Sequence, residues 1–93
     1  MKDVLHKAIE SYGKDNQLTV AVEELSELIK EICKHKRGED NRIRIIEEMA
    51  DCYIMLRQLE IMFDVSVNEL NKEISRKECR LSKRIERGVD DDR

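Results

Sequence analysis

Residues 49–63 have the sequence MADCYIMLRQLEIMF, and eleven of these fifteen residues are apolar. On a helical wheel the apolar residues point in nearly every direction, and a helix that is apolar all round is buried all round. Three partner helices would cover such a helix in part, and a second subunit would cover it better. We therefore predict an all-α, four-helix bundle-like fold that associates as a homodimer or homotetramer.

The rest of the chain is consistent with one helical domain over residues 1–93. It contains no proline and only three glycines, and 42% of its residues are charged. Domains built from β-strands need turn residues that this sequence lacks, whereas a proline-free, charge-rich composition is typical of helices. A chain of this length fits a single domain.

Glycines and capping residues divide the chain into four expected helices, over residues 2–12, 15–37, 41–63 and 67–87. Gly13, Gly38 and Gly88 each follow a helical stretch, as C-terminal caps do. The expected N-terminal caps are, in chain order, Asp15 or Asn16, Asp40 or Asn41, and a capping box of Ser66 and Glu69. The tail, residues 89–93, is expected to fray.

Charge and hydropathy exclude two classes of partner. The net charge of −3 argues against nucleic acid, which needs a broad basic surface. No apolar run approaches the roughly 18 residues of a membrane span, and the N-terminus has no signal-peptide core. The three cysteines are widely spaced and form no CxxC motif, as is typical of buried thiols in a reducing compartment. We expect a cytoplasmic protein.

Two of the expected helices carry acids at i, i+3 spacing, Glu24 with Glu27 and Glu48 with Asp51. A short connection around Gly38 makes these helices antiparallel neighbours, and at 1.5 Å per residue the two pairs lie at similar heights. Four carboxylates can then converge, and hard divalent cations prefer such oxygen ligands. Taken separately, the first pair also fits a solvated face and the second an interhelical ion pair. The four together favour a metal site.

Basic and amide side chains are the candidates for substrate contacts. Lys77, Arg80 and Arg84 share one side of the last expected helix and suit phosphate oxygens, although a solvated basic stripe is the alternative. Lys30 is a weaker phosphate candidate, because its charge also favours the helix dipole. Asn16 and Gln17 carry amides that a base edge could use, with capping or surface roles as the alternative.

The acidic pattern, Glu23-Glu24-x-x-Glu27 followed after 20 residues by Glu48-x-x-Asp51, resembles the EExxE…ExxD signature of the MazG-like nucleotide pyrophosphohydrolases. These enzymes belong to the all-α NTP pyrophosphatase superfamily. The similarity extends over residues 15–87, and Lys77-x-x-Arg80 is similar to the basic pattern of the family's late helix.

The resemblance implies a hydrolase that cleaves a ribo- or deoxyribonucleoside triphosphate into the monophosphate and pyrophosphate. It implies that Glu24, Glu27, Glu48 and Asp51 hold Mg²⁺, for which Mn²⁺ substitutes, and that Glu23 supports the first motif or positions the attacking water. The enzyme alternative is phosphoribosyl-ATP pyrophosphohydrolase, which shares the fold and the acidic signature. The alternative from another class is a non-catalytic helical dimerisation or interaction module.

Overall fold

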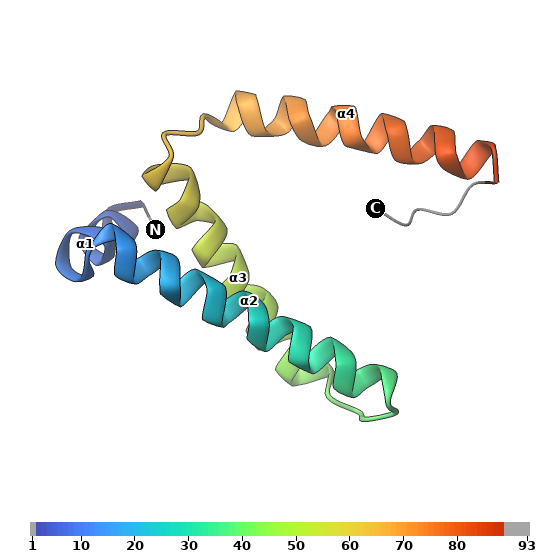
Figure 1. Ribbon diagram of the computed structural model, residues 1–93, viewed down its shortest axis with the longest axis horizontal. Helices are drawn as coiled ribbons and strands as arrows, with labels where there is room; N and C mark the ends of the chain where they lie inside the picture. Colours follow the sequence, from blue (N-terminus) through green and yellow to red (C-terminus); the bar gives the residue numbers. More distant parts are fainter. Residues whose placement is uncertain (1, 89–93) are drawn as a thin grey trace.

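Four helices follow one another in the computed structural model, which describes residues 2–88 (Figure 1). They are α1 (Lys2–Tyr12), α2 (Lys14–Lys36), α3 (Arg42–Met62) and α4 (Val67–Glu86). The described residues contain no strand, so the all-α expectation and the number of helices are confirmed. None of these helices combines the length and apolar character needed to cross a membrane. The tail at residues 89–93 lies outside the described range.

The link between α1 and α2 is shorter than expected. Gly13 alone separates the two helices, and its φ of 88° lies in the left-handed region that favours glycine. Its N–H donates to the carbonyl of Ile9 at 2.8 Å. The expected cap at Asp15 or Asn16 is therefore wrong, because both residues already lie inside the first turn of α2.

Helices α2 and α3 form an antiparallel hairpin, and α1 packs against both (Figure 1). At one end of the hairpin, the Lys14 ammonium lies 4.9 Å from the centroid of the Phe63 ring. The buried apolar side chains are few, namely Leu5, Ala21, Cys52 and Met55. An equal number of polar side chains is buried, namely Gln17, Glu31, Asn41 and Gln58.

At the other end of the hairpin, Glu31 ties α2 to α3. Asn41 occupies the N-cap position of α3, but its side chain makes no capping bond. Its Nδ2 donates instead to the backbone carbonyl of Glu31 at 2.9 Å and to Glu31 Oε1 at 2.8 Å. Arg44 Nε donates to the same oxygen at 3.2 Å, and Lys34 Nζ lies 3.4 Å from Oε2. The carboxylate of Glu31 is thus neutralised from both helices.

Helix α4 stands apart from the other three. Its N-terminus has the expected capping box, in which Ser66 Oγ accepts from the Glu69 N–H and Glu69 Oε1 accepts from the Ser66 N–H, both at 3.0 Å. Among the described residues, no Cα atom of α4 lies within 8 Å of a Cα atom of another helix. Three helices therefore pack together within one chain, and the fourth does not join them as a four-helix bundle requires.

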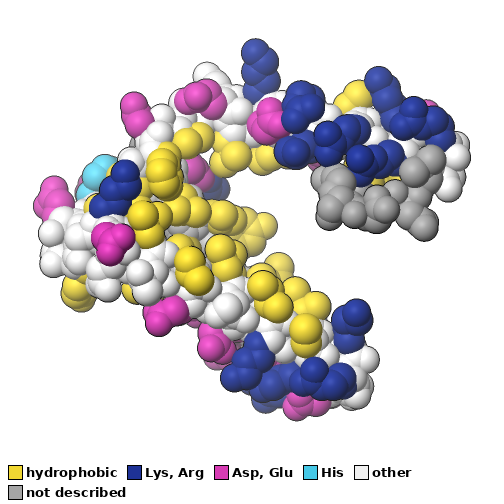
Figure 2. Space-filling model, viewed as in Figure 1, with side chains coloured by type: hydrophobic (Ala, Val, Ile, Leu, Met, Phe, Trp, Pro, Cys, Tyr) yellow, Lys and Arg dark blue, Asp and Glu magenta, His cyan; other side chains and the backbone are white. Residues whose placement is uncertain are grey.

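The apolar helix α3 is covered only in part within one chain, as expected: Cys52 and Met55 are buried, but other apolar side chains are not. Met49, Tyr53 and Leu56 are 42%, 61% and 45% exposed. Figure 2 shows apolar side chains gathered on the side of the hairpin that is turned toward α4. Of the cysteines expected to be buried, Cys52 is buried but Cys33 and Cys79 are exposed. Because the backbone of α4 stays away from the other helices, this face of α3 remains open within one chain.

Candidate metal centre

A row of polar side chains runs along the interface between α2 and α3, at intervals of seven residues on each helix. We call this row the polar seam, and its members are Gln17, Glu24 and Glu31 of α2 and Arg44, Asp51 and Gln58 of α3. Because the helices are antiparallel, the seam forms three layers. Gln17 lies with Gln58 beside one cavity, Glu24 lies with Asp51, and Glu31 bonds to Arg44.

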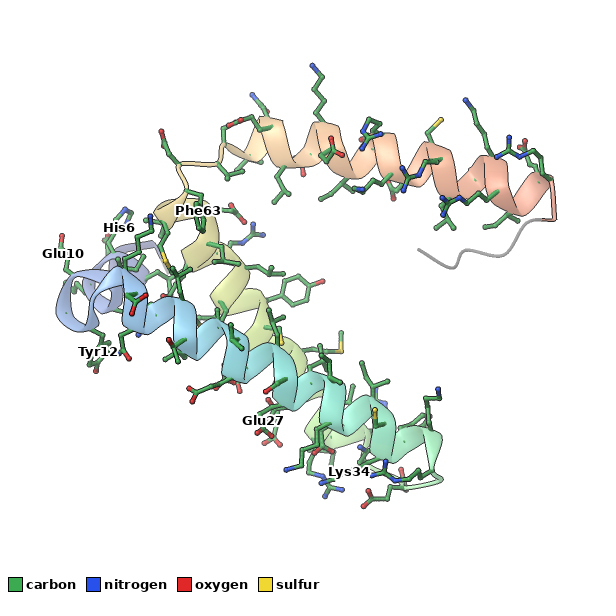
Figure 3. The ribbon with its side chains drawn as sticks, in the orientation of Figure 1. His6, Glu10, Tyr12, Glu27, Lys34 and Phe63 are labelled. Atoms are coloured by element: carbon green, nitrogen blue, oxygen red, sulfur yellow. The ribbon has the colours of Figure 1, made fainter. Side chains whose placement is uncertain are left out.

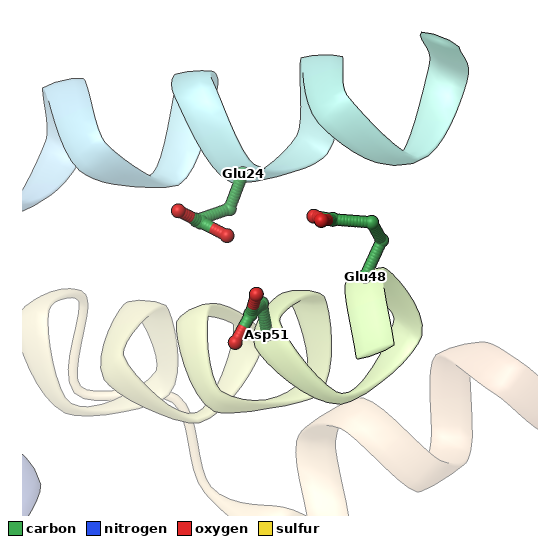
Figure 4. A group of neighbouring side chains, drawn as sticks. All are labelled: Glu24, Glu48 and Asp51. Atoms are coloured by element: carbon green, nitrogen blue, oxygen red, sulfur yellow. The ribbon is translucent and has the colours of Figure 1, made fainter. Parts of the chain in front are cut away.

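The middle layer is a cluster of three carboxylates, Glu24, Glu48 and Asp51, which we call the acid cluster. One carboxylate oxygen of each residue lies within 4.8 Å of those of the other two. Figure 4 shows the three side chains directed at one space between the helices, Glu24 from α2 and the other two from α3. The Cys52 thiol donates to the Glu24 backbone carbonyl at 3.5 Å and holds the helices together beside this space.

Charge in the acid cluster is not compensated by the protein. Burial, followed by the neighbouring Asp51 carboxyl, raises the pKa of Glu24, and burial and Asp51 likewise raise the pKa of Glu48. Glu48 Oε2 is buried without a hydrogen-bond partner. Ion pairs between described residues involve other carboxylates, namely Glu31, Glu39, Glu60 and Glu73. The cluster therefore concentrates negative charge that a cation would relieve.

The donor set fits a hard divalent cation. Mg²⁺ and Mn²⁺ prefer carboxylate oxygens, and Mg²⁺ is commonly held by one or two carboxylates with water and phosphate oxygens in its remaining positions. The adjacent Cys52 does not add a soft ligand, because its Sγ donates to the Glu24 carbonyl and lies outside the group of three. Glu24, Glu48 and Asp51 are the described residues that could hold the ion together.

The other two predicted acids lie at the margin of the cluster. Glu27 is exposed and falls outside the group of three, yet its charge helps to raise the pKa of both Glu24 and Glu48. Figure 3 shows Glu27 on the side of α2 that is turned away from α4. Glu23 is also exposed and lies outside the group, and its backbone carbonyl accepts a bond from Ser26 Oγ at 2.7 Å.

The predicted phosphate-binding residues are not gathered at the acid cluster. Lys77, Arg80 and Arg84 lie on α4, whose backbone stays more than 8 Å from α2 and α3, so one chain does not bring them there. Figure 2 shows the basic side chains of α4 far along that helix. Lys30 is closer, because it lies on α2 one turn beyond Glu27.

The predicted base-binding residues do adjoin the cluster. Asn16 and Gln17 line a cavity of about 420 Å³ that Glu24 and Asp51 also line. The same cavity is lined by Gln58, which our sequence analysis missed. The available signal was its spacing, since Gln58 follows Asp51 by seven residues just as Gln17 precedes Glu24 by seven.

Comparison with known protein families, curated protein sequences and solved structures finds no match for this chain.

Proposed function

We propose that this chain is a Mg²⁺-dependent nucleoside triphosphate pyrophosphohydrolase of the MazG-like kind. The observation that carries the proposal is the uncompensated acid cluster of Glu24, Glu48 and Asp51. It lies at the positions of the EExxE…ExxD pattern and opens onto a cavity large enough for part of a nucleotide.

In the proposed reaction, water attacks the α-phosphorus, the bond from that phosphorus to the bridging oxygen breaks, and pyrophosphate leaves the monophosphate behind. Bound Mg²⁺ supplies neutralisation of the phosphate charge and a lower pKa for coordinated water. The carboxylates of Glu24, Glu48 and Asp51 would hold the ion between α2 and α3. Glu27 stands at the solvent edge of the cluster, one turn from Glu24, where a change of rotamer would add a fourth carboxylate.

The test is pyrophosphate release from a panel of ribo- and deoxyribonucleoside triphosphates, with Mg²⁺ and with EDTA. We expect release that requires the metal, together with the matching monophosphate. Activity on phosphoribosyl-ATP alone would select the enzyme alternative. No release from a folded, Mg²⁺-loaded sample with either kind of substrate would contradict the proposal and favour a non-catalytic interaction module.

We also propose that the chain associates with copies of itself through exposed apolar side chains of α2, α3 and α4, which we call the apolar face. They include Ile29, Tyr53, Leu56 and Ile74. Its accessible surface is 7493 Å², whereas a compact monomer of this mass exposes about 5,600 Å². Its radius of gyration is 16.3 Å, against about 12 Å for a compact domain of this length. The excess of about 1,900 Å² is what one subunit of an obligate dimer buries. A second subunit would also offer a route by which Lys77, Arg80 and Arg84 meet an acid cluster.

Sedimentation velocity tests this association. The native chain is expected to sediment as a dimer or tetramer, and Tyr53→Glu, which places a charge in the middle of the apolar face, should shift it toward monomer. Val4→Glu is the matched control, because Val4 is similarly exposed but lies on α1. A native monomer at micromolar concentration would contradict the association and leave the metal proposal unaffected.

A further inference from the structure

The cavity beside the acid cluster is lined by both apolar side chains and carboxamides. It lies where α1, the start of α2 and the second half of α3 meet, and its volume is about 420 Å³. Tyr12, Ile54 and Met55 give it aromatic and apolar surface, while Gln17 and Gln58 add two carboxamides.

Gln17 and Gln58 are the only glutamines in the chain, and they are 6% and 4% exposed. Gln58 Oε1 is buried and has no hydrogen-bond partner. A buried acceptor without a partner destabilises the folded state, and leucine, which has a similar shape, would avoid this cost at the same position. Packing alone therefore does not account for a carboxamide at position 58, whereas a ligand that donates a hydrogen bond does.

We infer that this cavity receives the nucleobase of the substrate, and that the Gln58 carboxamide turns toward it, so that Oε1, buried in the empty cavity wall, accepts an N–H from the base edge. The inference rests on the proposed function and adds a specificity-determining residue to it. Each nucleobase carries at least one N–H on its pairing edge, and a carboxamide has both a donor and an acceptor to match it. The flat ring lies between the apolar side chains of Ile54 and Met55 and the Tyr12 ring, as small-molecule sites commonly combine apolar walls with a few polar groups.

The position of the cavity agrees with this orientation. Glu24 and Asp51 belong both to the cavity wall and to the acid cluster. A base in the cavity therefore has its 5′-phosphates beside the cluster, where a bound cation neutralises them. A ligand with a free carboxylate and no cation would be repelled by the same side chains.

The first test observes the two glutamines directly. In a sample labelled with ¹⁵N only in glutamine, the side-chain amide signals come from Gln17 and Gln58 alone. Adding nucleoside 5′-monophosphates in the presence of Mg²⁺ should shift the Gln58 signal, with shifts that differ among the bases. Inorganic tripolyphosphate, which has no base, should leave that signal in place. A Gln58 signal that no monophosphate moves, at concentrations that saturate the protein or up to the solubility limit, would overturn the inference.

The second test uses Gln58→Leu, which keeps the side-chain volume and removes the acceptor. For the native chain we expect dissociation constants that differ at least about fivefold among the four ribonucleoside monophosphates, and for the variant a spread below about twofold. Asn68→Leu, which makes the same kind of change at an exposed carboxamide of α4 outside the cavity, is the matched control and should retain the native ranking. An unchanged ranking in a folded Gln58→Leu variant would overturn the inference.

The two proposals fail in different ways. Tripolyphosphate affinity that depends on Mg²⁺ and on Asp51, with no base preference and an unmoved Gln58 signal, would remove the base site and keep the metal centre. Base-dependent shifts at Gln58 without pyrophosphate release from any triphosphate would keep the base site and remove the proposed hydrolysis.

Discussion

Two acidic sites lie a few turns apart in one helix interface, and the protein treats them differently. Glu31 receives bonds from Asn41 and Arg44 and lies beside Lys34. The bond from Asn41 contributes most to holding the pKa of Glu31 below its ordinary value, against the effect of burial. In the acid cluster every neighbouring charge that acts on Glu24 and Glu48 is negative, and their pKa values are raised.

The difference separates a structural acid from the acids of the proposed metal centre. Glu31 has its counter-charges built into the chain and joins α2 to the start of α3. The acid cluster lacks them, so the folded chain holds repelling carboxylates that an external cation would stabilise. A protein selected only for stability would place a basic side chain beside the acid cluster, as this one places Arg44 and Lys34 beside Glu31.

The largest expected effect follows from Asp51→Asn. Loss of this charge should lower metal-dependent pyrophosphate release roughly a hundredfold or more and abolish stabilisation by Mg²⁺, with the helical circular dichroism retained. Glu47→Gln is the matched control, because Glu47 is an exposed acid on the same helix outside the cluster. If both variants kept native turnover, Asp51 would have no part in the site.

The opposite behaviour is expected of Glu31→Gln. The amide cannot neutralise Arg44 and Lys34, so the melting temperature should fall by roughly 5–10 °C with or without Mg²⁺. Thermal unfolding by circular dichroism measures this change. A variant as stable as the native chain would remove the distinction between the two acidic sites.

Without metal, Glu48→Gln is expected to change the melting temperature less than Glu31→Gln does, and in the opposite direction. Removing one of three crowded charges, including a buried oxygen that has no partner, should raise the melting temperature at pH 7.5 by roughly 3–5 °C in EDTA. The same change should shrink the Mg²⁺-induced rise. Destabilisation in EDTA would show that the carboxylate already has a compensating partner.

The smallest expected effect is the change of the metal-free melting temperature with pH. Glu24 and Glu48 have raised pKa values when folded, so between the ordinary value of 4.5 and those raised values the folded state retains protons that the unfolded state has lost. Metal-free stability should therefore fall as pH rises through this interval, by roughly 2–4 °C in melting temperature.

The titration of Glu31 changes the stability in the opposite direction and in a lower pH range. Because its pKa is lowered, its stabilisation is present above 4.5 and is lost as pH falls below that value. Melting curves from pH 4 to 8 should show a maximum on the acid side of neutrality in EDTA, and less decline above it in Mg²⁺. A metal-free melting temperature that climbs steadily to pH 8 would contradict the raised pKa values.

Local rules in the sequence predicted much of the fold. The bounds of α1 match the expectation. The start of α4 also matches, and the other ends of α2, α3 and α4 each differ from it by one residue. The agreement is close because glycine positions and the Ser66 capping box are local signals. The caps of α2 and α3 were less predictable. Asn41 forms its bonds with Glu31, ten residues away in the sequence, and local capping rules do not include such a contact.

The site was predictable in part for a similar reason. Helical spacing together with an antiparallel turn was enough to bring Glu24, Glu48 and Asp51 together. It did not indicate that α4 would stand apart with its basic residues, because an amphipathic helix does not specify whether its partner lies in the same chain. Gln58 was missed because its seven-residue spacing from Asp51 points to a site only once its burial is known.

The central claim is that the chain binds a divalent cation at the acid cluster and not at Glu31. Adding substoichiometric Mn²⁺ to ¹⁵N-labelled protein tests it most directly, because the paramagnetic ion broadens nearby amide signals. We predict the strongest broadening at Glu24, Glu48 and Asp51, weaker broadening at Glu31 and Asn41, and none of this pattern in Asp51→Asn. Broadening that is uniform, or that is centred on Glu31, would contradict the account.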